Sequence, residues 1–388
     1  MRIAIIIGEL GAGGAERAAQ LLGDYLIEQG HQIYYFVFDT TEIKTNVRGT
    51  IVNVGVDIEE FAMASGVRFC FDRALIANAS KIKKQKRAYS IDIAISFMED
   101  SNYLNILSRY KEKVIVSVRT AISYRTDLPD YAKNVHAIKK LYPKANKVVA
   151  VSDFVKKDLI ENYGLKGNIV TVISNPAIKK FIDVANSEYK GKYKRIVCVA
   201  RLDPVKQHDR IIRAFSVVAE KANDARLVLV GDGKLKSYLM WLADKYSVLN
   251  RIDFVGYSKN VAEHLIGARA FVMASRAEGF PNAMVEAMAF GVPIISTDSP
   301  GGCGEILGKK ENAKGIEHCE FGVLTPYIVG KAPVYMELEK EEVDLGRAML
   351  QLIDDDEIFE KYSVASLRRA NKYSYENEMS KWERILAE

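Results

Sequence analysis

The segment 270–296 of the chain reads AFVMASRAEGFPNAMVEAMAFGVPIIS. Two short apolar runs, Ala270–Met273 and Pro293–Ser296, enclose a polar loop and a helix whose start is marked by Pro281 and Asn282. Apolar strands without polar alternation are buried on both faces, as in parallel sheets covered by helices. This segment therefore predicts a strand, a loop, a helix and a second strand of an α/β fold.

The same alternation of short apolar strands and amphipathic stretches runs through the whole chain. It restarts after a polar stretch near 184–194, which predicts two α/β domains, 1–185 and 186–364. The last segment, about 365–388, is expected to be a helix that could pack back on the first domain. The other predicted strands are Ile3–Ile7, Ile33–Phe38, Ile91–Phe97, Val114–Val118, Val148–Val151, Val170–Ile173, Arg195–Ala200, Leu227–Val230 and Ile252–Val255.

The composition is that of an ordinary globular protein. The chain has 388 residues, too many for one core, with 48% hydrophobic and 27% charged residues. No apolar stretch approaches the roughly 20 residues that span a bilayer, and the N-terminal run is too short for a signal peptide. The four cysteines and five histidines are scattered, which argues against a zinc site and against a disulfide framework. We therefore expect a cytoplasmic protein with no metal and no cofactor.

Positive charge is concentrated in the first predicted domain. Residues 1–185 carry 26 Lys and Arg against 20 Asp and Glu, whereas the rest of the chain carries 29 against 30. Part of the excess is a basic run of five residues, Lys81, Lys83, Lys84, Lys86 and Arg87. The basic run has two interpretations, a solvated helix face or attraction to anionic lipid head groups of about 1 kcal/mol per basic residue. A nucleic-acid partner is not expected.

A glycine-rich loop follows the first strand and places Gly13 and Gly14 just before a helix. A helix N-terminus offers backbone N–H groups to an anion, and glycines let the backbone approach a bound phosphate or sugar closely. The dinucleotide-binding fingerprint would require a third glycine at position 16, which is Glu16, so a nicotinamide oxidoreductase is disfavoured. The alternative is that the glycines only permit a tight strand-to-helix turn.

Two cations, Arg201 and Lys206, follow the strand Arg195–Ala200. They lie at the carboxyl edge of the second predicted sheet, where α/β proteins bind ligands. A guanidinium, an ammonium and helix N-terminal amides can stabilise a departing nucleoside diphosphate without a metal. The alternative is a pair of surface charges. The turn Gly231-Asp232-Gly233 follows the next strand and reaches the same edge.

Two carboxylates, Glu278 and Glu286, belong to the loop and the helix of the segment quoted above. Carboxylates accept paired hydrogen bonds from diols, so Glu278 could hold a donor hexose and Glu286 a ribose. The alternative is that Glu278 is only a solvated residue of a turn and Glu286 only a charged residue on a helix face. Their position at the same sheet edge as Arg201 and Lys206 favours a binding site.

These residues resemble the motifs of glycosyltransferase family 4, whose members share the GT-B fold of two Rossmann-like domains facing each other across a cleft. The resemblance covers essentially the whole chain. The matching positions are Gly13-Gly14, Arg201 with Lys206, Gly231-Asp232-Gly233, and the E-x7-E motif Glu278–Glu286 with Phe280, Pro281 and Asn282 inside it, together with Val149–Ser152 and Ile173–Pro176.

The resemblance implies a retaining, metal-independent transfer of a sugar from a nucleotide-sugar donor that we expect to be UDP-linked. The second domain would bind the donor, and the first would bind a glycan acceptor, lipid-linked or a surface polysaccharide. Weak peripheral contact with the inner face of the membrane is also expected. The implied catalytic residues are Arg201, Lys206 and Glu278, and the implied donor-binding residues are Gly13, Gly14, Gly231, Gly233, Phe280, Pro281, Asn282 and Glu286.

The chain departs from the family pattern after the fourth strand. Many relatives carry a His or an Arg-Asn there, whereas this chain has Arg119, whose role on the acceptor side or at the donor sugar stays open. The same fold also hosts sugar phosphorylases and nucleotide-sugar epimerases, and a catalytically silent nucleotide-sugar-binding module is a third alternative. The sequence does not identify the donor sugar or the acceptor.

Overall fold

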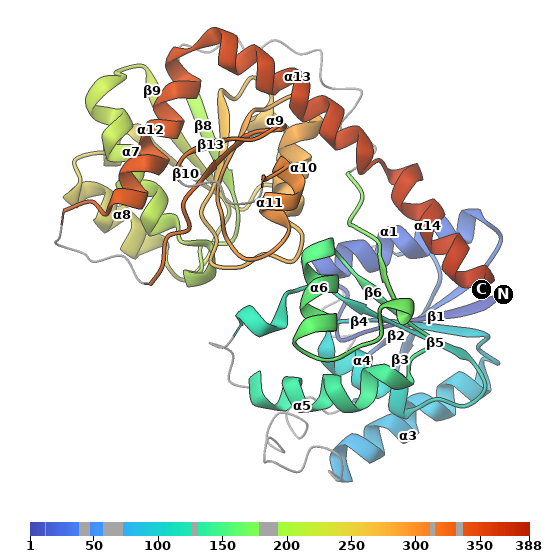
Figure 1. Cartoon of the computed structure of the whole chain (residues 1–388). Coiled ribbons are helices and arrows are strands. Elements are labelled where there is room, and N and C mark those ends of the chain that lie inside the picture. The colour runs from blue at the N-terminus through green and yellow to red at the C-terminus, as the bar shows by residue number, and fades with distance from the viewer. Residues whose placement is uncertain are drawn as a thin grey trace. The chain divides into compact units, whose positions relative to one another are not determined.

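The chain folds into two compact units. The computed structural model describes residues 1–11, 13–38, 47–56, 73–125, 131–177, 193–310, 315–330 and 337–388. Unit 1 comprises Met1–Pro176 and Glu376–Glu388, and unit 2 comprises Ala177–Tyr375 (Figure 1). The boundary predicted at 185 lies outside the described residues. Each unit is an α/β layer structure, as predicted, and contains one seven-stranded sheet.

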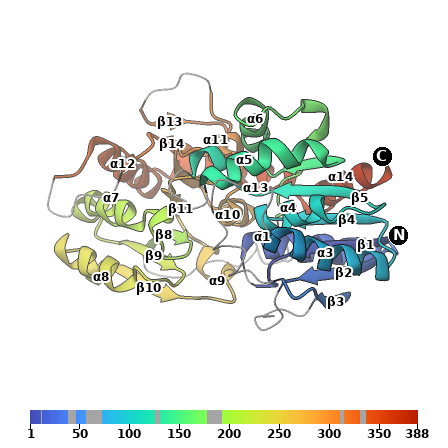
Figure 2. The same cartoon turned by 90° about the horizontal axis from the view of Figure 1, so that it is seen from below.

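The sheet of unit 1 has the strand order β3-β2-β1-β4-β5-β6-β7, and all its described pairs are parallel. Figure 2 lets the reader follow β3, β2, β1 and β4 side by side. The strands are β1 (Arg2–Ile7), β2 (Gln32–Val37), β3 (Thr50–Asn53), β4 (Ile93–Phe97), β5 (Lys113–Val118), β6 (Lys147–Ala150) and β7 (Val170–Val172). The helices are α1 (Gly14–Glu28), α3 (Arg73–Ala88), α4 (Glu99–Leu107), α5 (Tyr131–Leu141), α6 (Asp153–Glu161) and α14 (Tyr375–Ala387).

The sheet of unit 2 has the strand order β10-β9-β8-β11-β12-β14-β13, parallel except for the pair of β13 with β14. Its strands are β8 (Lys194–Val199), β9 (Ala225–Val230), β10 (Ile252–Gly256), β11 (Ala270–Met273), β12 (Ile294–Thr297), β13 (Glu317–His318) and β14 (Val323–Thr325). Its helices are α7 (His208–Lys221), α8 (Lys236–Lys245), α9 (Ala262–Leu265), α10 (Asn282–Ala289), α11 (Gly302–Leu307), α12 (Lys340–Asp354) and α13 (Asp356–Lys372).

All eleven predicted strands are present, because each is a short run of mainly apolar residues, and most of these runs are buried in their sheet. Every residue of β4, β11 and β12 is buried, as expected for strands covered on both faces. Three further strands are absent from the prediction, β3, β13 and β14, which are two to four residues long. β3 is an edge strand with three exposed residues, so no apolar run marks it.

The C-terminal segment is two helices where the sequence suggested one. α13 ends at Lys372, and α14 begins at Tyr375 after a short break. α13 belongs to unit 2, where it packs on α10, whereas nearly all of α14 belongs to unit 1. In unit 1 the indole of Trp382 lies against the ring of Phe97, with their centroids 6.3 Å apart. The chain therefore completes the core of its first unit with its last helix.

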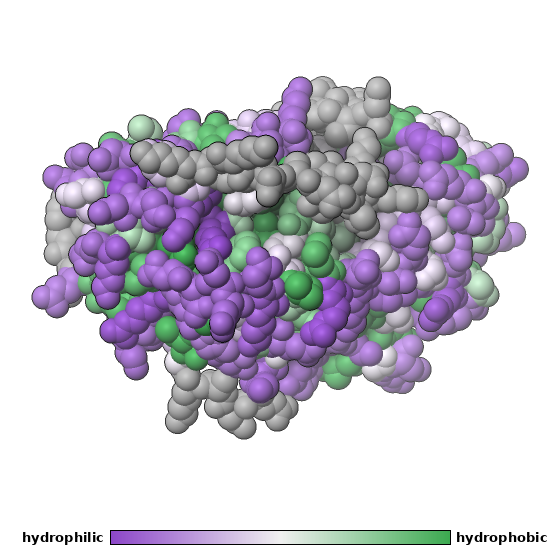
Figure 3. Space-filling model, turned by 90° about the horizontal axis from the view of Figure 1, so that it is seen from above, coloured by the Kyte–Doolittle hydropathy of each residue, from purple (hydrophilic) through white to green (hydrophobic). Residues whose placement is uncertain are grey.

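The face of the molecule seen in Figure 3 is predominantly hydrophilic. Among the described residues, no helix combines the length and the apolar character that crossing a bilayer requires.

Candidate functional site

The carboxyl edge of the unit 2 sheet brings together two of the predicted residues. Lys206 follows β8, Glu278 follows β11, and the Lys206 Nζ lies 2.6 Å from the Glu278 Oε1. Only 22% of the Lys206 side chain and 10% of the Glu278 side chain are exposed. Burial lowers the pKa of Lys206, but the charge and hydrogen bond of Glu278 outweigh it, so this pKa lies above its ordinary value. The site therefore holds a charged ammonium beside a carboxylate.

The loop that carries Lys206 is fixed by backbone contacts. Asp203 caps the short 3-10 helix η6 (Pro204–Lys206), and its carboxylate accepts hydrogen bonds from the Val205 and Lys206 N–H groups at 3.1 and 3.3 Å. The Arg276 N–H donates to the Val205 carbonyl at 2.8 Å, which joins this loop to the one after β11. The ammonium is thus placed by two loops held to each other.

The loop that carries Glu278 packs against a second loop, which requires a glycine at position 301. The Glu278 N–H donates to the Pro300 carbonyl at 3.0 Å. Gly301 has φ +134°, and a Cβ there would lie 1.6 Å from the Glu278 carbonyl oxygen. Any side chain at 301 would push these two loops apart, so the glycine sets the position of Glu278.

Arg201, by contrast, extends into solvent. Its side chain is 84% exposed, and its guanidinium lies 3.3 Å from the Asp203 carboxylate. Arg201 shares a loop with Lys206, but no described contact joins its side chain to the Lys206–Glu278 pair. A ligand at this edge would have to draw Arg201 in.

The turn Gly231-Asp232-Gly233 packs against the Arg201 loop. A Cβ at Gly231, which has φ +142°, would lie 2.0 Å from the Ala200 carbonyl oxygen, and one at Gly233 would lie 2.4 Å from the Leu202 carbonyl oxygen. The Leu202 N–H donates to the Asp232 carbonyl at 3.0 Å. Close packing of two loops accounts for both glycines, whose predicted contact with the donor stays a prediction.

The E-x7-E segment continues into α10, which begins at Asn282 as predicted, although its N-terminal cap is Pro281 and has no side-chain hydrogen bond. Phe280 is 6% exposed, and its ring packs edge-on against Tyr373 with centroids 5.1 Å apart. The Phe280 ring thus serves the core of unit 2. Glu286 lies within α10 and is 7% exposed, an unusual burial for a carboxylate.

Gly13 and Gly14 begin α1 in unit 1, with Gly13 at the N-terminal cap. A Cβ at Gly13 would lie 2.3 Å from the Glu16 Oε2, because the Glu16 side chain folds back over the start of its own helix. A carboxylate at a helix N-terminus is favourable, but it competes with a phosphate for the same amides. The predicted role of these glycines in donor binding remains a prediction.

Arg119 is held inside unit 1. Its guanidinium donates to the Ser117 Oγ at 3.1 Å and to the Asn175 side chain, and it lies 5.5 Å from the centre of the Phe97 ring. Burial lowers the pKa of Arg119 to about 9, and the charge of Glu378 opposes that shift. These contacts hold the Arg119 guanidinium between the end of β5 and Asn175, and its role on the acceptor side or at the donor sugar stays open.

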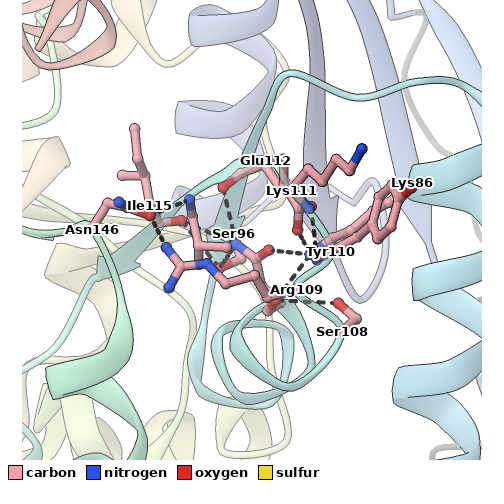
Figure 4. A network of polar contacts seen from close by, with 12 residues as sticks. Lys86, Ser96, Ser108, Arg109, Tyr110, Lys111, Glu112, Ile115 and Asn146 are labelled. Carbon is pink, nitrogen blue, oxygen red and sulfur yellow. Dashed lines mark hydrogen bonds and ion pairs between the residues drawn. The ribbon is translucent and has the colours of Figure 1, made fainter.

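The basic run is not wholly on the surface. Both interpretations of the sequence place all five residues there, and for Lys86 this is wrong. Lys86 is 1% exposed, and its ammonium lies 2.7 Å from the Glu112 Oε1; both residues are labelled in Figure 4. The Lys86 ammonium also donates a hydrogen bond of 2.8 Å to the Asn105 side chain. The Lys81 ammonium donates to the Gly55 carbonyl at 2.6 Å, and Arg87 lies over the Tyr110 ring. The basic run therefore presents fewer free cations than its five residues suggest.

Within the described parts of the chain, no group of three or more His, Cys, Asp or Glu is placed to hold a metal ion. The described cysteines Cys198, Cys303 and Cys319 are buried and unpaired, and Cys70 lies outside the described residues.

The sequence reasoning missed the residues after β4. Met98 has φ +74° and ψ 156°, a region that residues other than glycine rarely adopt, and it caps α4. Glu99 follows it, with a buried Oε1 that has no hydrogen-bond partner among the described groups. Their position just past a buried strand, at the ligand-binding edge of a parallel sheet, was the available signal.

Two family models match the chain. The model of glycosyltransferase family 4 matches residues 12–177, and the model of glycosyl transferases group 1 matches residues 179–318. An uncharacterized glycosyltransferase of Methanocaldococcus jannaschii is 28% identical over 342 residues, which are 80% of this chain and 83% of that protein. A Campylobacter jejuni enzyme, named as an N-acetylgalactosaminyltransferase acting on a diphospho-undecaprenol-linked sugar, is 25% identical over 96% of this chain and 95% of its own.

Solved structures share the fold over the whole chain. The Anabaena protein HepE in complex with UDP superimposes with a TM-score of 0.76 at 16% identity and full coverage of both chains. A glycosyltransferase of Rickettsia africae superimposes with a TM-score of 0.73 at 19% identity, covering 99% of this chain and 97% of that one. The fold of the chain is thus the GT-B fold.

Proposed function

The chain belongs to glycosyltransferase family 4, and from this premise we propose that it transfers a sugar from a UDP-linked donor to a glycan acceptor with retention of configuration. The single observation that carries the donor assignment is the buried Lys206–Glu278 pair at the sheet edge of unit 2. Support for a UDP donor comes from HepE, which has been crystallised with UDP and with UDP-glucose.

The Lys206–Glu278 pair is suited to stabilise the negative charge that develops on the departing diphosphate. In the transfer the acceptor oxygen bonds to the anomeric carbon, the bond from that carbon to the donor phosphate oxygen breaks, and the acceptor proton passes to the departing diphosphate. The Lys206 ammonium has three N–H donors, of which one meets Glu278, so two remain for phosphate oxygens. A preorganised cation in a partly buried site stabilises such developing charge more strongly than water does.

The carboxylates complete the donor site. Glu278 accepts hydroxyl groups of the donor sugar while it holds Lys206, and Glu286 accepts the two vicinal hydroxyls of the ribose. Arg201 swings from its solvent-exposed position to the diphosphate. We assign neither carboxylate as a general base, since the donor phosphate itself accepts the proton.

The reaction needs no divalent metal in this proposal, because Lys206, Arg201 and the N-terminal amides of α10 supply the positive potential. We further propose that the acceptor is lipid-linked or part of a surface polysaccharide. Two Campylobacter jejuni relatives are named as acting on diphospho-undecaprenol-linked glycans, and a relative from Erwinia amylovora is named for amylovoran biosynthesis. Such an acceptor would place the enzyme at the cytoplasmic face of the membrane.

A ligand screen followed by product analysis tests the proposal. UDP, GDP, ADP and their sugar conjugates are compared by thermal shift, since a ligand that binds only the folded state raises the melting temperature. We expect UDP and a UDP-sugar to stabilise the protein, and NMR of the product to show the anomeric configuration of the donor. Stabilisation by none of these nucleotides, or conversion of the donor to another sugar nucleotide without an acceptor, would overturn the assignment.

A further inference from the structure

A cavity of about 140 Å³ lies wholly within unit 1. It is lined at the carboxyl ends of parallel strands by Ile7 at the end of β1, Phe38 just after β2, and Met98 just after β4. The other described lining residues belong to α1, to α4 and to the segments that follow β1 and β3. This is the edge at which α/β sheets bind ligands, and the residues assigned to the donor leave this cavity unused.

The size of the cavity limits its ligand. A protein cavity of about 150 Å³ takes up one benzene molecule, whereas pockets for drug-sized ligands measure about 300–1,000 Å³. A volume of about 140 Å³ therefore takes up a group about as large as benzene, so one part of a sugar can enter the cavity and a nucleoside diphosphate cannot.

The charge of the lining excludes phosphate as well. Among the described residues of the lining, three are carboxylates, Glu9, Glu16 and Asp100, and none is Lys, Arg or His. Glu9 and Asp100 are exposed, which places negative charge at the mouth of the cavity. Carboxylates repel an anion but accept hydrogen bonds from hydroxyl and amide groups, so the cavity selects a neutral ligand with several donors.

The inner lining is apolar. Ile7, Phe38 and Leu104 are 2%, 5% and 0% exposed, and Val56 is 8% exposed. Such a wall favours carbon-bound hydrogens and a methyl group over further hydroxyls, which would be left without partners. A sugar ring with a 2-acetamido group offers both features, since its methyl is apolar and its amide N–H and hydroxyls donate.

Met98 adds an independent mark of function. Its backbone, at φ +74° and ψ 156°, is in a region that is unfavourable for residues with a side chain. This strained residue lines the cavity and its side chain is 39% exposed. Strain of this kind persists where the surrounding structure imposes it, and it concentrates at ligand-binding positions.

We propose that this cavity binds the terminal sugar of the acceptor, and that this sugar carries a 2-acetamido group whose methyl enters the apolar interior. The carboxylates Glu9 and Asp100 accept its hydroxyl and amide donors at the mouth. The inference rests on the proposed glycosyl transfer and adds the chemical class and the position of the acceptor sugar.

Saturation-transfer NMR on the whole protein tests this without requiring turnover. The probes are the methyl glycosides of N-acetylgalactosamine, N-acetylglucosamine, galactose and glucose, each with UDP present. We expect saturation of the acetamido methyl in at least one of the first two probes, and at least about tenfold weaker binding of the matching sugar without an acetamido group. Equal binding of the two members of a pair, or no binding of any probe, would overturn the inference.

Two sets of variants separate this inference from the proposed function. Glu9→Gln/Asp100→Asn should weaken binding of the acetamido sugar about tenfold or more, whereas Glu161→Gln, an exposed carboxylate of the same unit, should leave it unchanged. Both proteins should bind UDP like the wild type. Unchanged sugar binding in the double variant would overturn the assignment of the cavity to the acceptor sugar. If the wild type does not bind UDP, the donor assignment is overturned instead.

Discussion

Lys206 and Glu278 lie 72 positions apart in the chain, yet their ammonium and carboxylate meet at 2.6 Å at the edge of the unit 2 sheet. Each charge is mostly buried, so removing either one leaves the other without its partner. Breaking a buried pair in this way typically destabilises a protein by about 3–5 kcal/mol. A loss of activity on substitution must therefore be separated from a loss of stability.

The pair is tested by a single and a double variant. Lys206→Met should lower turnover by about 10²-fold or more, the scale for removing one preorganised donor, and should also lower the melting temperature. Lys206→Met/Glu278→Gln removes both charges and should recover much of the melting temperature while turnover stays low. Recovery of turnover together with stability would mean that the pair serves only the fold.

Turnover should not depend on a divalent metal. The positive charge that the leaving diphosphate needs comes from Lys206 and Arg201 in this account, so activity should survive treatment with EDTA. The measurement is the rate of UDP release before chelation, after chelation, and after addition of Mg²⁺ or Mn²⁺. A strict requirement that the added metal restores would contradict the expectation.

Glu99 should make the stability of the protein depend on pH. Burial raises the pKa of Glu99 to about 7 from the ordinary value of 4.5, so the folded protein binds this proton more tightly than the unfolded chain does. The resulting stabilisation is complete below pH 4.5 and is lost as the pH rises through 7. Glu99→Gln should therefore raise the melting temperature relative to wild type at pH 8 and have a smaller or opposite effect at pH 5.

The comparison of melting curves at the two pH values needs a carboxylate control. Glu161→Gln is suitable, because the side chain of Glu161 is 59% exposed. A melting-temperature difference between wild type and Glu99→Gln that is the same at pH 5 and pH 8 would show that Glu99 titrates normally.

Binding of the basic run to anionic membrane should be weak and should not involve Lys86. Judged from contacts among the described residues, at most Lys83 and Lys84 are free cations of the basic run, and each contributes about 1 kcal/mol near an anionic surface. Lys83→Gln/Lys84→Gln should reduce sedimentation with anionic liposomes at low salt, and the difference should vanish at high salt. Lys157→Gln/Lys166→Gln removes the same charge elsewhere in unit 1. Equal loss in both double variants would indicate a general charge effect.

Much of the fold could be predicted because its signal is local. Each of the eleven predicted strands is a short apolar run, and the order of strands and helices implies parallel sheets. β14 could not be predicted, since a strand of only three residues, Val323–Thr325, is too short to show a periodic pattern. Lys86 was misplaced although a signal existed, because it lies four residues after the buried Ile82 and so on the same helix face.

The candidate site was predictable to the same degree. Lys206 and Glu278 each follow a strand in the sequence, and parallel strands end at one edge, so their meeting could be expected. The cavity of unit 1 could not be predicted from the sequence, because its walls come from the ends of several strands and from two helices. The exposure of Arg201 is likewise a property of the folded loop and is not encoded in any spacing.

The central claim is that the edge of unit 2 holds the donor nucleoside diphosphate, and Glu286 tests it most directly. Glu286→Gln keeps the shape of the side chain and replaces one acceptor oxygen with a donor, so one of the two hydrogen bonds to the ribose is lost. A charged hydrogen bond contributes about 1.5–3 kcal/mol, which corresponds to about a 10- to 150-fold change in affinity. Glu263→Gln, whose exposed carboxylate lies in the same unit, is the matched control. Calorimetric titration with UDP should show this weakening in Glu286→Gln and none in the control, and equal UDP affinity in the wild type and Glu286→Gln would contradict the account.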